Sequence, residues 1–233
     1  MSSIDVTSPD KKTIRRYFNE VAFRYDFLNG FLSFRLDEGW RRRAARMVLN
    51  GNQQTVLDLG VGTGKFLETL QAMQPWRRAV GLDFAAAMLQ RARAESKGAA
   101  QFVSADFHDL PFRDGAFDLV VSSFTLRSVK DLPRFLGEIH RIMSPAGKVG
   151  LLCLTRPENP LWQALYYPYL KFYIPLMGCV MSGHREAYRF LSDSIGEFQR
   201  PEETMKRMSA AGFSSIQKRA FTFGAATLLV AEK

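Results

Sequence analysis

The sequence predicts an α/β fold with a mostly parallel, seven-stranded sheet, an antiparallel C-terminal strand and helices on both faces. The first observation is that five short apolar runs alternate with segments of helical spacing between residues 55 and 155. This alternation is typical of buried parallel strands joined by crossover helices. The second is a pair of strand-like runs at the C-terminus with only a short turn between them, so they must pair antiparallel. In such sheets, ligands bind beyond the carboxyl ends of the strands.

Each expected element can be placed by its residues. The expected strands are TVLDL (55–59), RAVGLDF (78–84), AQFVSAD (100–106), FDLVVSSF (117–124), KVGLLCLT (148–155), SSIQKRAFT (214–222) and GAATLLVAE (224–232). The expected helices are KFLETLQAM (65–73), AAMLQRARAE (86–95), DLPRFLGEIHRIM (131–143) and a last one near 201–211. We expect one domain over 1–233, made of an N-terminal helical cap (10–49), a ligand-binding core (55–155), an aromatic-rich lid insertion (158–198) and a C-terminal helix and hairpin (201–233).

Composition limits the functional classes. The chain has 233 residues, of which 46% are hydrophobic, and can therefore bury one sizeable core. Its two cysteines are too few for a disulfide framework and its polar N-terminus lacks the apolar core of a secretory signal, so we expect a cytoplasmic protein. The formal charge of +9 favours a polyanionic partner, either nucleic acid or an anionic membrane surface. Residues 161–181 are the most apolar, but Lys171, Pro168 and Pro175 argue against a spanning helix and leave a segment that could lie on a bilayer.

A glycine turn follows the first strand, in VLDLGVGTGKFLETL (56–70). It does not match the P-loop, because only three residues separate Gly60 from Gly64 and no Ser or Thr follows the lysine. It is also a poor dinucleotide fingerprint, which would need a glycine where Lys65 stands. The remaining pattern, D-x-G-x-G-x-G from Asp58, places a carboxylate that would repel a pyrophosphate but suits an ammonium group. S-adenosylmethionine carries such a group and no phosphate, and it is the expected cofactor.

Two further acids close the next strands. Asp83 ends the second expected strand, where a carboxylate accepts hydrogen bonds from ribose hydroxyls in related nucleotide sites. Asp106 ends the third and is expected to accept a hydrogen bond from the adenine amino group, with Phe107 beside the ring. Any one of these acids alone would suit a helix cap or a turn, but three at successive strand ends favour a ligand site. The predicted cofactor-binding residues are Asp58, Gly60, Gly62, Thr63, Gly64, Asp83, Phe84, Asp106, Phe107 and Ser123.

Three segments outside the glycine turn resemble one branch of a known family. The pattern F-x-x-V-A-x-x-Y-D-x-x-N-x-x-L-S runs from Phe18 to Ser33, S-F-T-L-R-S-V begins at Ser123, and A-Y-R-F-L-x-x-S-I begins at Ala187. With the glycine motif, they make the chain similar to the class I S-adenosylmethionine-dependent methyltransferases, and most similar to the branch that C-methylates quinone precursors in menaquinone and ubiquinone biosynthesis. The resemblance covers nearly the whole chain. It implies a Rossmann-like fold and a lipid quinol substrate, with demethylmenaquinol as the first choice and a ubiquinol precursor as the second.

The chain departs from the branch's pattern at several positions. Thr125 and Ser128 stand where the branch's S-F-G-L-R-N has glycine and asparagine. Asp37 stands where its G-I-H-R-x-W has histidine, and M-S-P-A-G at 143–147 replaces L-K-P-G-G. These changes leave the expected cofactor site intact. Because Thr125 and Ser128 would lie beside the acceptor, the identity of the acceptor stays open.

The expected reaction needs a nucleophilic ring carbon, which a hydroquinol provides when a neighbouring hydroxyl loses its proton. A permanently charged guanidinium stabilises that phenolate, and Arg127, just beyond the fourth strand, is the candidate; its alternative role is a salt bridge to Asp131. Tyr25 and Tyr188 are candidates to position or deprotonate the hydroxyl, and are otherwise packing aromatics. His184 is a minor candidate for a general base. The sequence shows no cluster of His, Cys and acids with metal-ligand spacing, so we expect no metal.

Partners follow from the same features. The stretch ALYYPYLKFYIPLM (164–177) suits a channel for a polyprenyl chain or contact with a membrane, and equally the core of a lid. The basic residues of the N-terminal helices either attract anionic lipid or form a solvated face; they are Arg15, Arg16, Arg41, Arg42, Arg43 and Arg46. A homodimer is also allowed. Nucleic acid is not an expected partner, because SSFTLR after the fourth strand resembles neither a catalytic cysteine motif nor an N-P-P-Y motif. The alternatives left open are an N- or O-methyltransferase of a soluble small molecule, an RNA methyltransferase and a non-catalytic binding protein.

Overall fold

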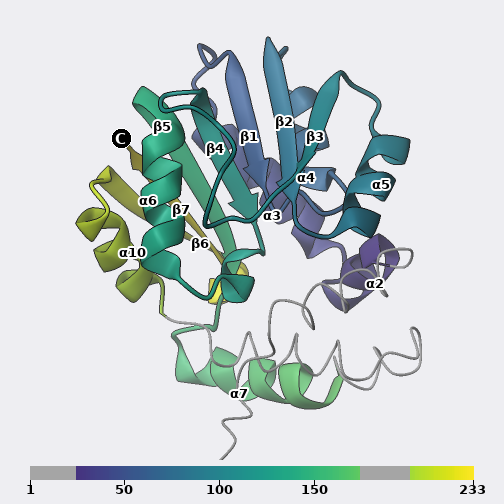
Figure 1. The fold of residues 1–233 in the computed structure, drawn as a ribbon. Coiled ribbons are helices and arrows are strands. Elements are labelled where there is room, and N and C mark those ends of the chain that lie inside the picture. The colour runs from purple at the N-terminus through teal and green to yellow at the C-terminus, as the bar shows by residue number, and fades with distance from the viewer. Residues whose placement is uncertain (1–24, 174–199) are drawn as a thin grey trace, which may run out of the picture.

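A sheet of seven strands forms the centre of the computed structural model, which describes residues 25–173 and 200–233 (Figure 1). The strands are β1 (Thr55–Leu59), β2 (Arg78–Asp83), β3 (Ala100–Ser104), β4 (Phe117–Ser123), β5 (Met143–Leu154), β6 (Ser214–Phe221) and β7 (Ala226–Glu232). They lie in the order β3-β2-β1-β4-β5-β7-β6. Strands β1 to β5 are parallel, whereas β7 runs antiparallel to both β5 and β6. The predicted sheet and its antiparallel C-terminal strand are therefore confirmed.

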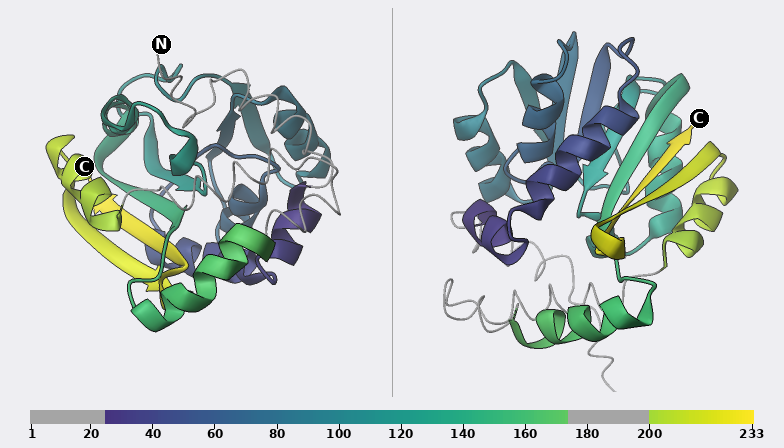
Figure 2. Two further views of the ribbon diagram at one scale, coloured as in Figure 1. Left: turned by 90° about the horizontal axis from the view of Figure 1, so that it is seen from below. Right: turned by 180° about the vertical axis from the view of Figure 1, so that it is seen from behind.

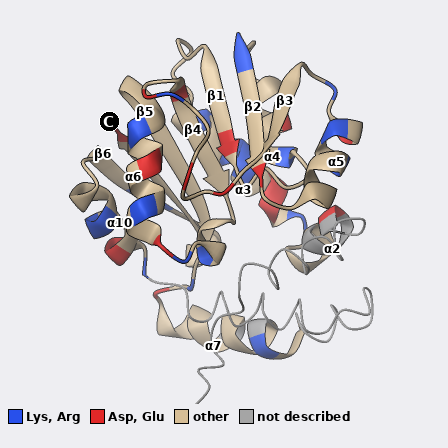
Figure 3. Ribbon diagram, viewed as in Figure 1, with Lys and Arg blue, Asp and Glu red and all other residues tan. Residues whose placement is uncertain are grey.

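The strand order reverses between β1 and β4. The chain first builds outward from β1 through β2 to β3, and then returns to place β4 on the other side of β1. In register, Asp58 of β1 lies between Gly81 of β2 and Val121 of β4. Figure 3 shows acidic residues at the carboxyl ends of β1 and β2. Ligands of open α/β sheets bind at such a reversal, because the connections leave the two central strands in opposite directions.

Helices cover both faces of the sheet, as predicted (Figures 1 and 2). One face carries α3 (Leu36–Val48), α4 (Lys65–Gln71) and α5 (Ala86–Glu95), and the other carries α6 (Leu132–Ile142) and α10 (Pro201–Ala210). The helix α6 begins at Leu132 because the side chain of Asp131 accepts a hydrogen bond from the backbone N–H of Arg134, at 3.0 Å. The four helices predicted from spacing are confirmed, with small differences at their ends.

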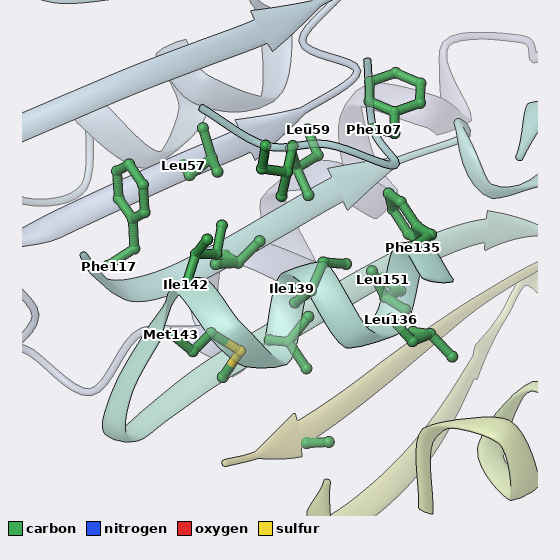
Figure 4. Close-up of a cluster of buried hydrophobic side chains, with 14 of the residues drawn as sticks. Leu57, Leu59, Phe107, Phe117, Phe135, Leu136, Ile139, Ile142, Met143 and Leu151 are labelled. Atoms are coloured by element: carbon green, nitrogen blue, oxygen red, sulfur yellow. The ribbon is translucent and has the colours of Figure 1, made fainter. Parts of the chain in front are cut away.

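Alternate residues of the strands feed two separate hydrophobic clusters. On one face, Leu57 and Leu59 of β1 pack against α6, where Figure 4 shows Phe135 and Ile139 beneath them. On the other face, Val56 of β1 packs with α3 and α4. Successive side chains of a strand point to opposite faces, so a residue two positions after Val56 points toward α3 and α4. That residue is Asp58.

The structure differs from prediction at two strands. The strand β5 begins at Met143 rather than at residue 148, because Met143 pairs with Phe117 ahead of a register shift in this strand pair. The strand β3 was expected to be buried, but it is an edge strand and exposes Gln101 and Ser104. An edge strand has a neighbour on one side only, so its side chains are less completely covered.

Two helical segments lie beyond the carboxyl ends of β1 and β4 (Figures 1 and 2). They are α2 (Tyr25–Leu32) on the N-terminal side, and α7 (Pro160–Pro168) with the π-helical turn η3 (Tyr169–Tyr173) after β5. The hydroxyl of Tyr169 donates to the carbonyl oxygen of Leu32. The ring of Phe34 stacks on that of Tyr173, with ring centroids 6.0 Å apart. The segment after β5 therefore packs against the segment before α3.

Among the described helices, none is long and apolar enough to cross a membrane. The bounds of the cap (10–49) and the lid (158–198) stay predictions, because much of both lies outside the described residues.

Candidate active site

The glycine turn connects β1 to α4. Gly60, Gly62 and Gly64 have φ of 73°, 54° and 94°, in the left-handed region that favours glycine. The backbone N–H groups of Gly60 and Val61 both donate to the carbonyl oxygen of Leu82, at 2.8 and 3.0 Å. The turn is therefore fixed against the end of β2.

Asp83, the last residue of β2, makes a second attachment between the glycine turn and β2. Its Oδ2 accepts a hydrogen bond from the N–H of Gly62 and its Oδ1 accepts one from the N–H of Ala85, both at 2.9 Å. Burial raises the pKa of the Asp83 carboxyl above its ordinary value, and these hydrogen bonds partly offset the effect of burial. The carboxylate thus holds the turn and the start of α5 in one arrangement.

Asp58 lies completely buried beneath the turn. Neither carboxylate oxygen has a hydrogen-bond partner of ordinary geometry among the described residues, although the N–H of Leu67 lies near enough to favour the charged form. Burial raises the pKa of Asp58 to about 7; the charge of Asp83 also raises it, and that of Arg41 lowers it. A buried carboxylate without hydrogen bonds is unfavourable unless a cation compensates it. The interior beneath the turn therefore favours a positively charged ligand.

A small cavity opens beside the turn, at the carboxyl ends of β1, β2 and β4. It is lined by Gly60, Gly62, Asp83, Phe84, Met88, Phe107, Ser123, Phe124, Thr125 and Ser128. Phe84 and Phe107 meet edge to face, with centroids 5.6 Å apart, and form an apolar wall. The structure thus brings together Gly60, Gly62, Asp83, Phe84, Phe107 and Ser123 of the predicted cofactor-binding residues.

Two residues that line this cavity, Met88 and Phe124, are not among the predicted cofactor-binding residues. Phe124 is the last residue of the expected fourth strand and Met88 lies in the helix expected after Asp83, so their positions in the chain were the available signal. Met88 lies in the first turn of α5, after Asp83, and Phe124 directly follows the last residue of β4.

The remaining predicted cofactor-binding residues lie outside the cavity lining: Asp58, Thr63, Gly64 and Asp106. The hydroxyl of Thr63 donates to Oδ1 of Asp26 at 2.6 Å, which ties α2 to the glycine turn. Oδ1 of Asp106 accepts a hydrogen bond from the backbone N–H of His108 at 3.0 Å and lies 2.7 Å from Nδ1 of its ring. The role of Asp106 toward adenine stays a prediction.

Among the predicted catalytic residues, Arg127 is the one whose side chain the structure describes. It lies half-buried in the 3-10 turn η2 (Leu126–Ser128), next to Ser128, which lines the cavity. The backbone of Tyr25 begins α2, but its side chain lies outside the described residues, as do Tyr188 and His184 entirely.

The prediction that Arg41 belongs to a surface-exposed basic face is wrong. Arg41 is buried, and its guanidinium donates to Oδ2 of Asp37 at 2.6 Å. It lies on the stripe of α3 that also carries the buried Ala44 and Ala45, and this stripe packs on the sheet. Its three- and four-residue spacing from those alanines was a signal in the sequence. Arg42, Arg43 and Arg46 are exposed, while Arg15 and Arg16 lie outside the described residues.

The described residues fit S-adenosylmethionine. The partly compensated carboxylate of Asp58 suits a ligand with ammonium and sulfonium charges. The glycine turn allows a ligand to approach its backbone, because no Cβ of Gly60 or Gly62 intervenes. The Phe84–Phe107 wall suits the flat adenine ring.

Comparison with known proteins identifies the family of the chain. The sequence profile of the ubiE/COQ5 methyltransferase family matches residues 6–233. A demethylmenaquinone methyltransferase from Thermus thermophilus is 39% identical over 219 residues, which cover 93% of this chain and 99% of that protein. A ubiquinone/menaquinone biosynthesis C-methyltransferase UbiE from Geotalea daltonii is 33% identical, with 94% of this chain and 96% of that protein covered.

The fold has counterparts among solved structures. A crystal structure of an S-adenosylmethionine-dependent methyltransferase from Thermotoga maritima, described as a possible histamine N-methyltransferase, superposes with a TM-score of 0.68 at 20% identity, covering 94% of this chain and 99% of that one. At this identity the likeness supports the fold alone. Because the family profile spans nearly the whole sequence and the turn, sheet and cavity suit the donor, the chain belongs to the ubiE/COQ5 methyltransferase family and is an S-adenosylmethionine-dependent methyltransferase.

Proposed function

We propose that the protein transfers a methyl group to a ring carbon of a reduced prenylated quinone precursor, with demethylmenaquinol as the first choice and a ubiquinol precursor as the second. The observation that carries this proposal is the nearly full-length similarity, at 39% identity, to a protein named demethylmenaquinone methyltransferase. The family profile, which matches residues 6–233, also covers the N-terminal and post-β5 regions, which lie outside the donor-binding core.

The proposed donor site depends on two carboxylates, those of Asp83 and Asp58. The Asp83 carboxylate, already oriented by the N–H groups of Gly62 and Ala85, accepts hydrogen bonds from the ribose hydroxyls. Asp58 acts from beneath the turn as a buried counter-charge. When bound, S-adenosylmethionine supplies a methyl group from its sulfonium. The protein's task is then to align the acceptor with that methyl group and to exclude water.

The acceptor side is assigned to the loop after β4. The guanidinium of Arg127 stabilises the phenolate that forms when the ring hydroxyl loses its proton, and so raises the nucleophilicity of the neighbouring ring carbon. That carbon would take the methyl group as the sulfur–methyl bond breaks and the neutral thioether leaves. The carbon then loses its own proton, which restores the aromatic ring. Thr125 and Ser128, which line the cavity beside Arg127, border the acceptor. Tyr25 and Tyr188 are proposed to position the hydroxyl.

A lipid-tailed acceptor suits the surface beyond the strands. Trp162, Tyr167 and Phe172 of α7 and η3 are exposed, as is Phe34 next to them. Such aromatics suit contact with a polyprenyl chain or with a bilayer that contains it. We therefore propose a cytoplasmic protein that binds the membrane surface peripherally, in which the exposed Arg42, Arg43 and Arg46 of α3 would attract anionic lipid.

Replacing Arg127 with Ala should lower kcat about 100-fold and leave the Kd for S-adenosylmethionine nearly unchanged, because Arg127 stabilises charge on the acceptor. Isothermal calorimetry measures the Kd, and transfer of labelled methyl at saturating donor measures kcat. Arg134→Ala, an exposed arginine on α6, is the matched control and should retain both values. Equal losses of turnover and donor affinity in the Arg127 variant would instead make this residue structural.

The acceptor itself is tested by incubating the protein with isotopically labelled methyl donor and, separately, extracted quinols, soluble phenols or RNA. Mass analysis then locates the label. Label on a ring carbon of a lipid quinol supports the proposal. Label on a heteroatom of a soluble phenol supports the N- or O-methyltransferase alternative, and label only in RNA overturns the proposal.

A further inference from the structure

A buried ion pair lies on the helix that covers the donor side of the sheet. Arg41 and Asp37 of α3 are both buried, with 2.6 Å between Nη1 and Oδ2. Oδ1 of Asp37 also accepts a hydrogen bond from the hydroxyl of Ser33 at 2.6 Å. Nε of Arg41 has no hydrogen-bond partner among the described residues. Burying an arginine is unfavourable unless nearby groups compensate the loss of its hydration. The groups that face Arg41 therefore indicate what its charge does.

The first of these groups is Phe124, in the wall of the cavity. The guanidinium of Arg41 lies over its ring, 5.1 Å from the centroid, and Trp40 meets the same ring edge-on. The backbone of Phe124 has a φ of 60°, which few residues other than glycine adopt. Its N–H donates to the carbonyl oxygen of Leu152 at 2.7 Å. Contacts from α3 thus hold the ring of Phe124, and the hydrogen bond to β5 holds its backbone in a conformation that residues with a side chain disfavour.

The second group is Asp58. It points to the face of the sheet that α3 covers, and Arg41 lies one turn ahead of Ala44 and Ala45 on the helix stripe that packs there. Since α3 runs back toward the start of β1, its first turns lie near the end of that strand, where Asp58 is found (Figure 2). The charge of Arg41 lowers the pKa of Asp58, against the effects of burial and of Asp83.

We propose that Arg41 is a positioning residue for the methyl donor: its guanidinium, anchored by Asp37, supplies the positive charge that Asp58 faces and supports the Phe124 wall of the cavity. The donor's positive groups bind more tightly when Asp58 is ionised. Arg41 therefore extends donor binding to lower pH without itself lining the cavity. The inference concerns the donor only and does not depend on which acceptor is used.

The test measures the Kd for S-adenosylmethionine by calorimetry between pH 5.5 and pH 9, in the full chain. The affinity should increase as the pH rises through the pKa of Asp58, because only the carboxylate attracts the donor. The charged groups that act on Asp58 are Arg41 on α3 and Asp83 on β2, and the backbone N–H of Leu67 on α4 is the polar group near its carboxylate. In Asp58→Asn the part of this pH dependence that belongs to Asp58 should disappear.

Two substitutions of the ion pair should move the midpoint in opposite directions. Arg41→Met removes the positive charge, so the midpoint should shift upward by about one pH unit and the affinity at pH 6.5 should fall about tenfold. Asp37→Asn leaves Arg41 charged and removes its partner, so the midpoint should shift downward. Arg41→Lys keeps the charge and should stay near the wild-type midpoint. Arg42→Met, which removes an exposed charge from the neighbouring position, is the matched control and should leave the midpoint unchanged.

A purely structural role for the pair predicts a different result. Arg41→Met and Asp37→Asn would then weaken donor binding by the same factor at every pH, with the midpoint unmoved, and that outcome overturns the proposal. If Asp37→Asn does not fold, the comparison of Arg41→Met with Arg41→Lys decides, because only the charge differs in its effect on Asp58. Equal midpoints in those two variants would also overturn it.

Discussion

Replacing Asp83 with Ala is expected to weaken S-adenosylmethionine binding about 1000-fold. The variant would lose the charge-assisted hydrogen bonds that we propose Asp83 accepts from the ribose hydroxyls, each worth about 1.5–3 kcal/mol. It would also free the N–H groups of Gly62 and Ala85. The turn that depends on the carboxylate then loses one of its two attachments to β2. Calorimetry with the purified variant measures the affinity directly.

Controls separate binding from folding in this experiment. Asp109→Ala removes an exposed acid from the loop after β3 and should bind the donor as the wild type does. Asp83→Asn keeps an acceptor oxygen and should lose less affinity than Asp83→Ala. Circular dichroism and thermal unfolding establish whether each variant is folded. A folded Asp83→Ala variant with wild-type affinity would remove Asp83 from the donor site.

Gly60→Ala is the second change with a large expected effect. A Cβ on Gly60 would lie 2.2 Å from Oγ1 and 2.5 Å from Cγ2 of Thr125, and the φ of 73° strains any residue with a side chain. The strain costs about 1–2 kcal/mol and the overpacking about 1–3 kcal/mol, so donor binding should fall about 1000-fold or the turn should unfold locally. Calorimetry and thermal unfolding together measure the two effects.

A double substitution distinguishes the two causes. Thr125→Gly removes the side chain that Gly60→Ala would strike, so Gly60→Ala/Thr125→Gly should recover much of the lost affinity and retain only the backbone strain. Gly137→Ala in α6 is the matched control: a Cβ there meets nothing within 4 Å, and the change should be neutral or slightly stabilising. If the double variant is no better than Gly60→Ala alone, contact with Thr125 is not the cause.

The sheet and the glycine turn were predictable because their signals are local. Apolar runs such as 55–59 give strands by composition alone, and positive φ at Gly60 is confined to a few residue types. The position of Asp83 was predictable because this residue ends a strand, and the carboxyl ends of parallel strands lie at the same edge of the sheet. In these cases, the neighbours in the chain suffice to set the conformation.

Side-chain surroundings were harder to predict because they depend on which elements meet in space. Arg41 stands in a run of basic residues that is typical of a solvated surface. The small side chains of Ala44 and Ala45, however, let α3 approach the sheet closely, and this approach buries Arg41. Asp58 was predicted from its motif, but its lack of ordinary hydrogen bonds depends on how α3 and α4 cover β1. The contact between Gly60 and Thr125 likewise joins residues far apart in the sequence.

The reversal of strand order has a further consequence for how long the folded chain survives. The cavity takes part of its lining, such as Asp83, from the half of the sheet that contains β1 to β3, and part, such as Ser123, from the half that begins with β4. A molecule bound there contacts both halves and stabilises the junction between β1 and β4. Occupancy of the cavity should therefore slow local opening of both halves together, and protection from proteolysis should increase with the concentration of methyl donor.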